Sequence, residues 1–428
     1  MLARLGLASA GALDVGMNII PRDRLIRSAV LFVALAGGSA QSQDMLSGVT
    51  ARAPDAFYDP PANVPRRPGA LMRSEPLRNV TLPDGMRGWR ILYATTVDDK
   101  TPATAVATVF APVKPSAVPR PVIMWEHGTT GLGQKCMPSL VSAPALGIPA
   151  LDRIVKAGWV IVATDYSFAE KGGPHPYVIG EGEARAGLDS VRAAQMMPEL
   201  TLDARTVVWG HSQGGHSALW TGIVGPRYAP DVQIVGVAAI APPGDMATLL
   251  AMNVPLDKRL GPYVAMAYSR FYPDIRFEKA VRPQALAAAR EIVNLCGFIP
   301  PQDPWRIGQL ITTFDGPALA TGSNAALAAR LAQNAANHPV AVPLLIAQGG
   351  ADAVVLPAAT DAYVEARCAA GQRLEYWKFV GLDHSGIVRP GAALETPLVA
   401  WTTARFANEP QPSGCARRST PEAGPRPR

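Results

Sequence analysis

A serine between glycines is the feature of this chain best suited to chemistry. The apolar run 207–209 leads into residues 210–214, Gly-His-Ser-Gln-Gly, and a helix-like segment follows at once. A G-x-S-x-G pattern allows a sharp strand-to-helix turn that presents one hydroxyl, here Ser212, as a nucleophile. The backbone N–H of Gln213 would begin the helix and point at an oxygen gaining negative charge. The pattern alone also fits a glycine-rich turn that caps a buried strand.

A nucleophilic serine requires a base and an orienting carboxylate, and candidates for both follow in the chain. Asp352 comes after the apolar run 342–348 and two glycines, and His384 lies in a loop after the strand-like run 374–380. The order serine, aspartate, histidine, each just past a predicted strand, is typical of α/β-hydrolases. We therefore predict that Ser212 is the nucleophile, Asp352 the acid and His384 the base.

Three residues compete for these roles. His127 ends the strand-like run 122–127 and is the alternative base. Asp165 ends another strand but precedes the serine, whereas Asp383 adjoins His384 and would struggle to face it. Packing or loop positions are predicted for the other histidines, which are His175, His211, His216 and His338.

The segments around these candidates resemble the secretory lipases of the α/β-hydrolase superfamily, a group with fungal lipase A-type and actinobacterial members. The resemblance extends over residues 57–415 and rests on short motifs at 57–61, 127–131, 136–139, 163–166, 175–177, 188–194, 210–214, 348–352 and 383–384. It implies a Ser212, Asp352, His384 triad, hydrolysis of carboxylic esters and a helical cap over an acyl pocket. As in related hydrolases, the loop after the His-Gly pair is expected to supply a second oxyanion donor, at Thr129. Fungal members carry an aspartate in this loop, which here reads His-Gly-Thr-Thr.

The four cysteines Cys136, Cys296, Cys368 and Cys415 indicate an oxidising compartment, because their number is even and the chain carries an export signal. Three pairings are possible, and four free thiols are the alternative. The family resemblance implies the disulfides Cys136–Cys296 and Cys368–Cys415. No cysteine or histidine spacing suggests zinc and no phosphate-binding loop follows a strand, so no metal and no cofactor are expected.

Residues 1–40 are predicted to be a secretory signal peptide. Arg22, Arg24 and Arg27 precede the apolar run 29–36, and small residues up to Ala40 precede a polar stretch. The apolar core is shorter than the roughly 20 residues that cross a bilayer. We expect a secreted or periplasmic protein, cleaved near Ala40, with no transmembrane segment in the mature chain.

The net charge of +6 does not indicate a nucleic-acid-binding protein. Much of the excess lies in the signal peptide and in residues 409–428, an Arg/Pro-rich tail predicted to be disordered beyond Cys415. No basic stretch is interleaved with aromatic residues for base stacking.

The hydrophobic fraction of 48% in 428 residues is enough for one large α/β domain with an insertion. The alternation of strands and helices predicts a mostly parallel sheet. The expected organisation is an N-terminal arm (41–76), the first part of the hydrolase core (77–241), a helical cap or lid (242–338) and the second part of the core (339–408). A hairpin is predicted for 90–96 with 105–111. Strands are predicted near 121–127, 159–165, 206–211, 234–240, 343–348 and 374–380, and helices at 150–157, 181–197, 213–224 and 357–370.

The expected function is hydrolysis of a small-molecule or lipid ester through an acyl-enzyme intermediate, with contact to a lipid–water interface as one setting. Two other classes stay open. The same triad can transfer an acyl group or cleave an amide, and a hydrolase fold can serve as a non-catalytic binding protein.

Overall fold

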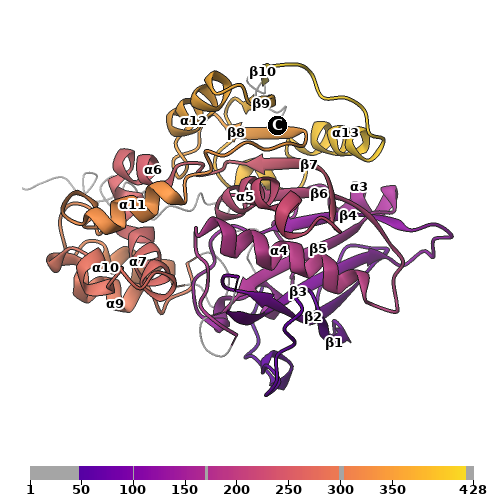
Figure 1. Ribbon diagram of the computed structural model, residues 1–428, viewed down its shortest axis with the longest axis horizontal. Helices are drawn as coiled ribbons and strands as arrows, with labels where there is room; N and C mark the ends of the chain where they lie inside the picture. The colour runs from indigo at the N-terminus through magenta and orange to yellow at the C-terminus, as the bar shows by residue number, and fades with distance from the viewer. Residues whose placement is uncertain (1–47, 100, 169–171, 298–302, 421–428) are drawn as a thin grey trace, which may run out of the picture.

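The computed structural model describes residues 48–99, 101–168, 172–297 and 303–420 (Figure 1). The predicted signal peptide and its cleavage site lie outside these residues. The described strands form one sheet in the order β1-β2-β3-β5-β4-β6-β7-β8-β9-β10. Their bounds are β1 Leu71–Pro76, β2 Met86–Thr96, β3 Pro102–Pro112, β4 Arg120–Glu126, β5 Val160–Ser167, β6 Leu202–His211, β7 Gln233–Ile240, β8 Leu344–Gly349, β9 Leu374–Phe379 and β10 Cys415–Thr420.

The sheet is antiparallel at one side and parallel elsewhere. β1, β2, β3 and β5 pair antiparallel, and every pairing from β5 through β4 to β10 is parallel. The predicted hairpin and the six predicted strands are confirmed, with boundaries that differ by a few residues. Because the parallel strands point the same way, the loops after their carboxyl ends meet at one edge of the sheet.

Helices cover both faces of the sheet (Figure 1). Side chains alternate along a strand, so Val208 of β6 packs in the core with α4 and α5, whereas Val207 and Trp209 pack with α3 and α13. The described α-helices are α3 Leu151–Ala157, α4 Gly180–Gln195, α5 Gln213–Tyr228, α6 Met246–Met252, α7 Val254–Phe271, α8 Phe277–Ala280, α9 Leu286–Ile292, α10 Pro304–Leu310, α11 Ala325–Gln333, α12 Pro357–Ala369 and α13 Glu395–Phe406. In the described part of the chain, no helix has the length and apolar character needed to span a bilayer.

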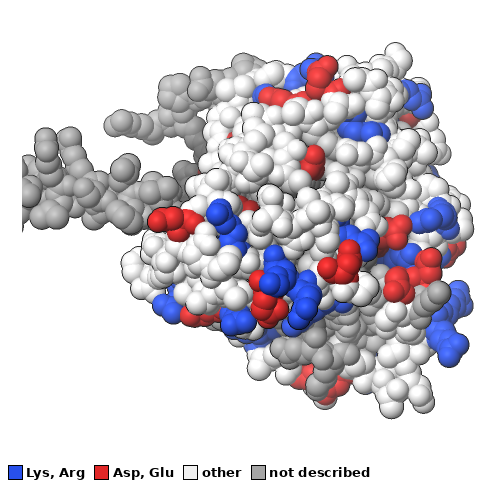
Figure 2. All heavy atoms as spheres, turned by 60° about the vertical axis from the view of Figure 1, so that its left-hand side comes forward, with Lys and Arg blue, Asp and Glu red and all other residues white. Residues whose placement is uncertain are grey.

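The segment between β7 and β8 is helical and has a hydrophobic core of its own. α6 to α11 lie here, and their buried side chains form a separate cluster that includes Leu249, Tyr263, Ile292 and Leu331. Figure 2 shows the face on which these helices come forward, where Lys and Arg are mixed with Asp and Glu and no large area of one sign appears.

The C-terminal tail differs from the prediction. Disorder was expected beyond Cys415, but Cys415–Thr420 form β10, parallel to β9. The disulfide to Cys368 of α12 fixes the start of this strand, and the Arg418 guanidinium lies over the Trp377 ring. Local composition could not indicate these long-range contacts. Residues 421–428 lie outside the described part.

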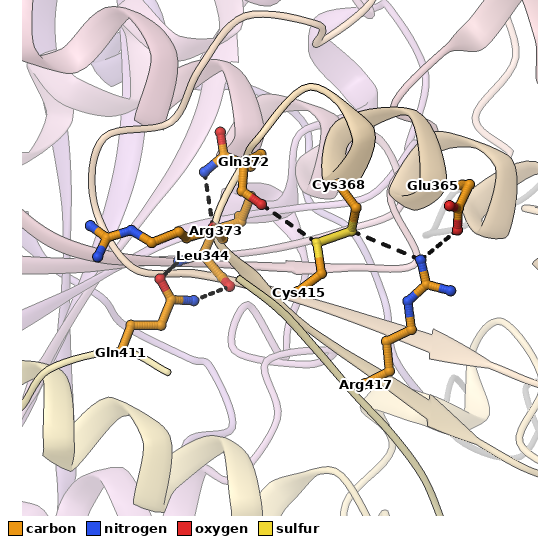
Figure 3. The surroundings of a disulfide bond; sticks show 8 residues. All are labelled: Leu344, Glu365, Cys368, Gln372, Arg373, Gln411, Cys415 and Arg417. Carbon is orange, nitrogen blue, oxygen red and sulfur yellow. Dashed lines mark hydrogen bonds and ion pairs between the residues drawn. A yellow bond between two sulfur atoms is a disulfide. The ribbon is translucent and has the colours of Figure 1, made fainter. Parts of the chain in front are cut away.

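Two further side chains hold the segment around β10 (Figure 3). Gln411 accepts a hydrogen bond from the backbone N–H of Leu344 at 3.3 Å and donates to its carbonyl at 2.7 Å. Arg417 donates to Glu365 of α12 at 2.6 Å. The end of the chain is thereby attached to β8 and α12.

Candidate active site

Ser212 lies at the turn between β6 and α5 in a strained backbone conformation. Its φ of 58° and ψ of −122° are rare for a residue with a side chain. The Ser212 N–H donates to the Ile240 carbonyl of β7 at 2.9 Å, and the Ser212 carbonyl accepts from Gly215 and His216 in the first turn of α5. The neighbouring strand and the helix therefore hold the turn in place.

The glycines of the turn are required by close backbone approaches. A Cβ at Gly210 would lie 1.9 Å from the Gly214 carbonyl oxygen, and a Cβ at Gly214 would lie 1.8 Å from that of Glu126. A Cβ at Gly128 would lie 3.3 Å from the Ser212 Cβ. The loop after β4 thus passes directly beside the serine.

Asp352 and His384 are joined by a hydrogen bond. Nδ1 of His384, in the loop after β9, lies 2.7 Å from Oδ2 of Asp352, in the loop after β8. The N–H groups of Val354 and Val355 donate to Oδ1 at 2.8 and 2.9 Å, and Gln348 donates to Oδ2 at 3.1 Å. The carboxylate is buried and has a fixed orientation.

His211, the residue before Ser212, holds the His384 loop beside the turn. The two imidazole rings lie 4.6 Å apart between centroids. Because a carbonyl can only accept, Nε2 of His211 donates to the His384 carbonyl oxygen at 2.8 Å. Burial, together with His384, lowers the pKa of His211 to about 3, so its ring is neutral. Within the described residues, no hydrogen bond joins the Ser212 hydroxyl to His384, a bond that often forms only when substrate binds.

The two predicted oxyanion donors lie at one cavity with Ser212. The cavity is narrow, with a volume of about 10 Å³. Gln213 is the first residue of α5, so its N–H has no acceptor within the helix. Thr129 lines the same cavity from the loop after β4, and its Oγ1 lies 2.9 Å from the Tyr177 hydroxyl.

Most of the cavity wall is apolar and comes from two regions. Met246, Leu249, Leu256 and Leu260 belong to α6 and α7, and Val354 and Val355 follow Asp352. Pro243 and Tyr177 complete the lining. A serine at the end of an apolar wall has the composition of an acyl-binding site, and in this closed conformation the wall must move before an acyl chain can enter.

The comparisons with known proteins find similarity to lipases. Residues 145–266, which include the serine turn, match the secretory lipase family model. The resemblance to the secretory lipases is confirmed. The chain is 25% identical to a probable inactive lipase of Mycobacterium tuberculosis over 83% of its length and 82% of the relative's. It is 24% identical to a secreted triacylglycerol lipase of Malassezia globosa, over 86% of this chain and 85% of that one.

Solved structures of a lipase and an esterase have a similar fold. Candida antarctica lipase A superposes with a TM-score of 0.69 at 19% identity, covering 86% of this chain and 89% of that chain. The esterase LipA of Xanthomonas oryzae, described as degrading rice cell walls, gives a TM-score of 0.58 at 20% identity, over 80% and 96% of the two chains. The fold is that of an α/β-hydrolase, as predicted.

The rivals for the catalytic roles have other partners in this fold. Nδ1 of His127 contacts the Gly128 carbonyl at 2.6 Å, and burial lowers the pKa of His127 to about 4. The Asp165 carboxyl accepts from the Ser139 N–H at 3.2 Å. Asp383 accepts from the Gly386 N–H at 2.6 Å within its own loop. None of the three takes part in the Asp352–His384 contact.

Sequence reasoning missed two buried carboxyl groups beneath the serine turn. Glu126 ends β4 and accepts from Thr221 at 3.1 Å, and Glu183 of α4 contacts Gln213 and His216. Burial, and then the nearby Glu183, raise the pKa of Glu126 well above its usual range. A glutamate at the end of an apolar strand was a signal for Glu126, but Glu183 lies in a polar, glycine-rich stretch that gives none.

The structure forms the two disulfides that the secretory-lipase resemblance implies. Cys136 joins Cys296, and near this bond the Gly297 N–H donates to the Thr130 carbonyl at 3.0 Å. Cys368 joins Cys415, so all four cysteines are paired. Among the described residues, no cluster of His, Cys, Asp or Glu could hold a metal ion.

Proposed function

We propose that this chain is a secreted serine hydrolase that cleaves carboxylic esters through Ser212, His384 and Asp352. The observation that carries the proposal is the His384–Asp352 hydrogen bond, in a loop that His211 fastens beside the strained serine. A histidine ring oriented by a buried carboxylate at a nucleophile elbow is the arrangement that activates a serine hydroxyl.

In the proposed reaction, His384 takes the Ser212 proton as Oγ attacks the ester carbonyl. Asp352 keeps the imidazole in the reactive tautomer and stabilises its cation. The tetrahedral intermediate collapses when His384 protonates the leaving alcohol, which leaves an acyl-enzyme. Water, deprotonated by His384, then attacks the acyl group, and the returned proton frees Ser212 and the acid. The N–H groups of Gln213 and Thr129 stabilise both oxyanions, each by about 3 kcal/mol.

The proposed substrate is a small-molecule or lipid ester with an apolar acyl group. The apolar wall from α6 and α7 supports this, as does the similarity to secretory lipases. Residues 242–338, which carry these helices, would act as the cap, and opening at a lipid–water interface would admit longer chains. Acyl transfer and amide cleavage need the same residues. Acyl transfer would appear as an ester product formed with added alcohol, and amide cleavage as turnover of an amide substrate.

Export is the proposed cellular context. The signal-like residues 1–40, two disulfides and secreted relatives support it. N-terminal sequencing of the protein recovered from the medium or periplasm should begin near Gln41. A product that retains residues 1–40 would contradict the proposed cleavage.

The deciding experiment is hydrolysis of p-nitrophenyl esters from acetate to palmitate by the mature chain, beside Ser212→Ala. We expect the variant to fold and to lose at least about 10⁴-fold in kcat, because serine removal in such triads disables the whole unit. A fluorophosphonate should label only the wild type. One relative is a probable inactive lipase, so a folded, disulfide-bonded wild type with neither turnover nor labelling would indicate a non-catalytic binding protein.

A further inference from the structure

Glu183 of α4 is a fully buried carboxyl group with three hydrogen-bonding partners beneath the serine turn. Its Oε1 accepts from the Gln213 side-chain amide and from the Val178 backbone N–H, both at 2.9 Å. Its Oε2 lies 2.9 Å from Nδ1 of His216. Gln213 and His216 belong to α5 and Val178 to the loop before α4, so one carboxyl of α4 joins these two segments.

The first contact bears on one candidate oxyanion donor. Gln213 lines the cavity and is the first residue of α5, where no preceding helical turn restrains it. The hydrogen bond from Nε2 of Gln213 to Glu183 restrains this residue from below. Loss of the acceptor would leave a buried amide unpaired, which is unfavourable and favours rearrangement of the turn.

The second contact bears on the other donor through Tyr177. Val178, the next residue, has a φ of 47°, a strained value that needs support from its surroundings. Its N–H bonds to Glu183 and its carbonyl accepts from the Tyr268 hydroxyl at 3.1 Å. The Tyr177 side chain, buried at the cavity, then contacts Thr129 Oγ1 at 2.9 Å.

The third contact joins the site to the helices between β7 and β8. Nε2 of His216 lies 2.8 Å from the Asn334 carbonyl at the end of α11, and because a carbonyl only accepts, Nε2 donates. The Asn334 side chain in turn accepts from the Gly180 N–H at the start of α4. Glu183 therefore lies where α4, α5 and α11 meet.

Building on the proposed function, we propose that Glu183 is a positioning residue whose Oε1 holds the two candidate oxyanion donors, Gln213 and Thr129, at the Ser212 cavity. The role requires an acceptor at Oε1 and not a charge. Burial raises the pKa of Glu183, which is consistent with a group that acts as an acceptor without full ionisation. A glutamine fits the same contacts, since its oxygen can accept at Oε1 while its amide donates to Nδ1 of a neutral His216.

The test compares Glu183→Leu, which removes the acceptor, with Glu183→Gln, which keeps it. We expect Glu183→Leu to lower kcat about 10- to 100-fold with KM changed less than about threefold, because removal of a whole oxyanion donor costs about 10²- to 10³-fold. Glu183→Gln should recover at least about a third of wild-type kcat. The acid limb of the pH profile of kcat/KM should not move in either variant, because the His384–Asp352 contact is elsewhere. Glu181→Gln, on the exposed side of the same helix, is the matched control and should match the wild type.

Several results would overturn the proposal. Equal losses in Glu183→Leu and Glu183→Gln, full activity in Glu183→Leu, or a shifted acid limb would each do so. If Glu183→Leu does not fold, Gln213→Met, which removes only the amide donor, should show the same fall in kcat at constant KM, and unchanged kcat would refute the role. An active wild type with an inactive Ser212→Ala and an unaffected Glu183→Leu refutes only this inference. An inactive wild type refutes the proposed function and this role with it.

Discussion

Oδ2 of Asp352 and Nδ1 of His384 lie 2.7 Å apart, although the two residues follow different strands of the sheet. β8 and β9 are parallel neighbours, so the loops after their carboxyl ends emerge together. The buried Asp352 carboxylate also accepts from two backbone N–H groups and from Gln348. These bonds hold the carboxylate in one orientation. The contact therefore fixes the orientation of the His384 imidazole.

The first prediction concerns this contact. Asp352→Asn should fold, because its side-chain oxygen can still accept from Val354 and Val355. Its amide would donate to His384 and favour the tautomer that cannot take the Ser212 proton, so kcat should fall by about 10³- to 10⁴-fold. Ester turnover measures kcat, and circular dichroism shows whether the variant is folded.

Asp383→Asn is the matched control, since Asp383 adjoins His384 and, among the described residues, its side chain accepts from the Gly386 N–H alone. An asparagine oxygen can accept the same bond, so activity should stay within about threefold of the wild type. A large loss in Asp383→Asn and none in Asp352→Asn would show that the acid is misassigned.

The sequence predicted those parts of the fold that local patterns encode. Apolar runs ending in glycine or histidine identified β6 and β8, because a buried parallel strand is mostly apolar and its end carries the site. β10 was missed, since its stability comes from a disulfide to α12 and from pairing with β9. Neither contact is visible in an Arg/Pro-rich stretch.

The candidate site divides in the same way. Ser212, Asp352 and His384 could be selected because their order, and their positions after predicted strands, can be read from the sequence. Their catalytic roles stay predictions, which Ser212→Ala and Asp352→Asn test. Glu183 could not be selected. Its importance arises from its burial and from partners contributed by two other segments, α5 and the loop before α4. Only the packing of these segments reveals them.

A second prediction separates the two disulfides. Both should stabilise the fold by restricting the unfolded chain, by about 2–5 kcal/mol each. The sequence separations are 160 for Cys136–Cys296 and 47 for Cys368–Cys415, so loss of the first should cost slightly more. Chemical unfolding of the two double alanine variants measures this difference.

Only the first disulfide should affect activity. A Cβ at Gly131 would lie 2.7 Å from Sγ of Cys136, so the bond packs directly against the loop that carries Thr129. Cys136→Ala with Cys296→Ala should lower kcat several-fold, whereas Cys368→Ala with Cys415→Ala should leave it within about twofold. Equal kcat values in both variants would show that the first disulfide does not support this loop.

A third prediction concerns the turn glycines. A Cβ at Gly214 would lie 1.8 Å from a backbone oxygen that cannot move aside, so Gly214→Ala should lose at least about 3 kcal/mol or fail to fold. Gly308, inside α10, has nothing within 4 Å of its Cβ position. Gly308→Ala should therefore gain about 0.5–1 kcal/mol through helix propensity. Thermal unfolding compares the stability of the two variants. Wild-type stability of Gly214→Ala would contradict the close approach of residue 214 to the Glu126 carbonyl oxygen.

The last prediction is a pH dependence of stability at Asp165, whose carboxyl is buried against the Ser139 N–H. Burial raises the pKa of Asp165 from 3.8 to about 7. An acid that binds its proton more tightly in the folded state destabilises the fold on ionising, so its contribution falls as pH rises from about 4 to about 7 and is constant above that. An asparagine at this position cannot ionise. Asp165→Asn should thus match the wild type near pH 4 and exceed it by about 4 kcal/mol at pH 7.5, since one pKa unit corresponds to about 1.4 kcal/mol. Urea unfolding at both pH values, with the disulfides intact, measures the difference. A stability gain that is the same at both pH values would mean that folding does not raise the pKa of Asp165, and that the Ser139 N–H offsets the effect of burial.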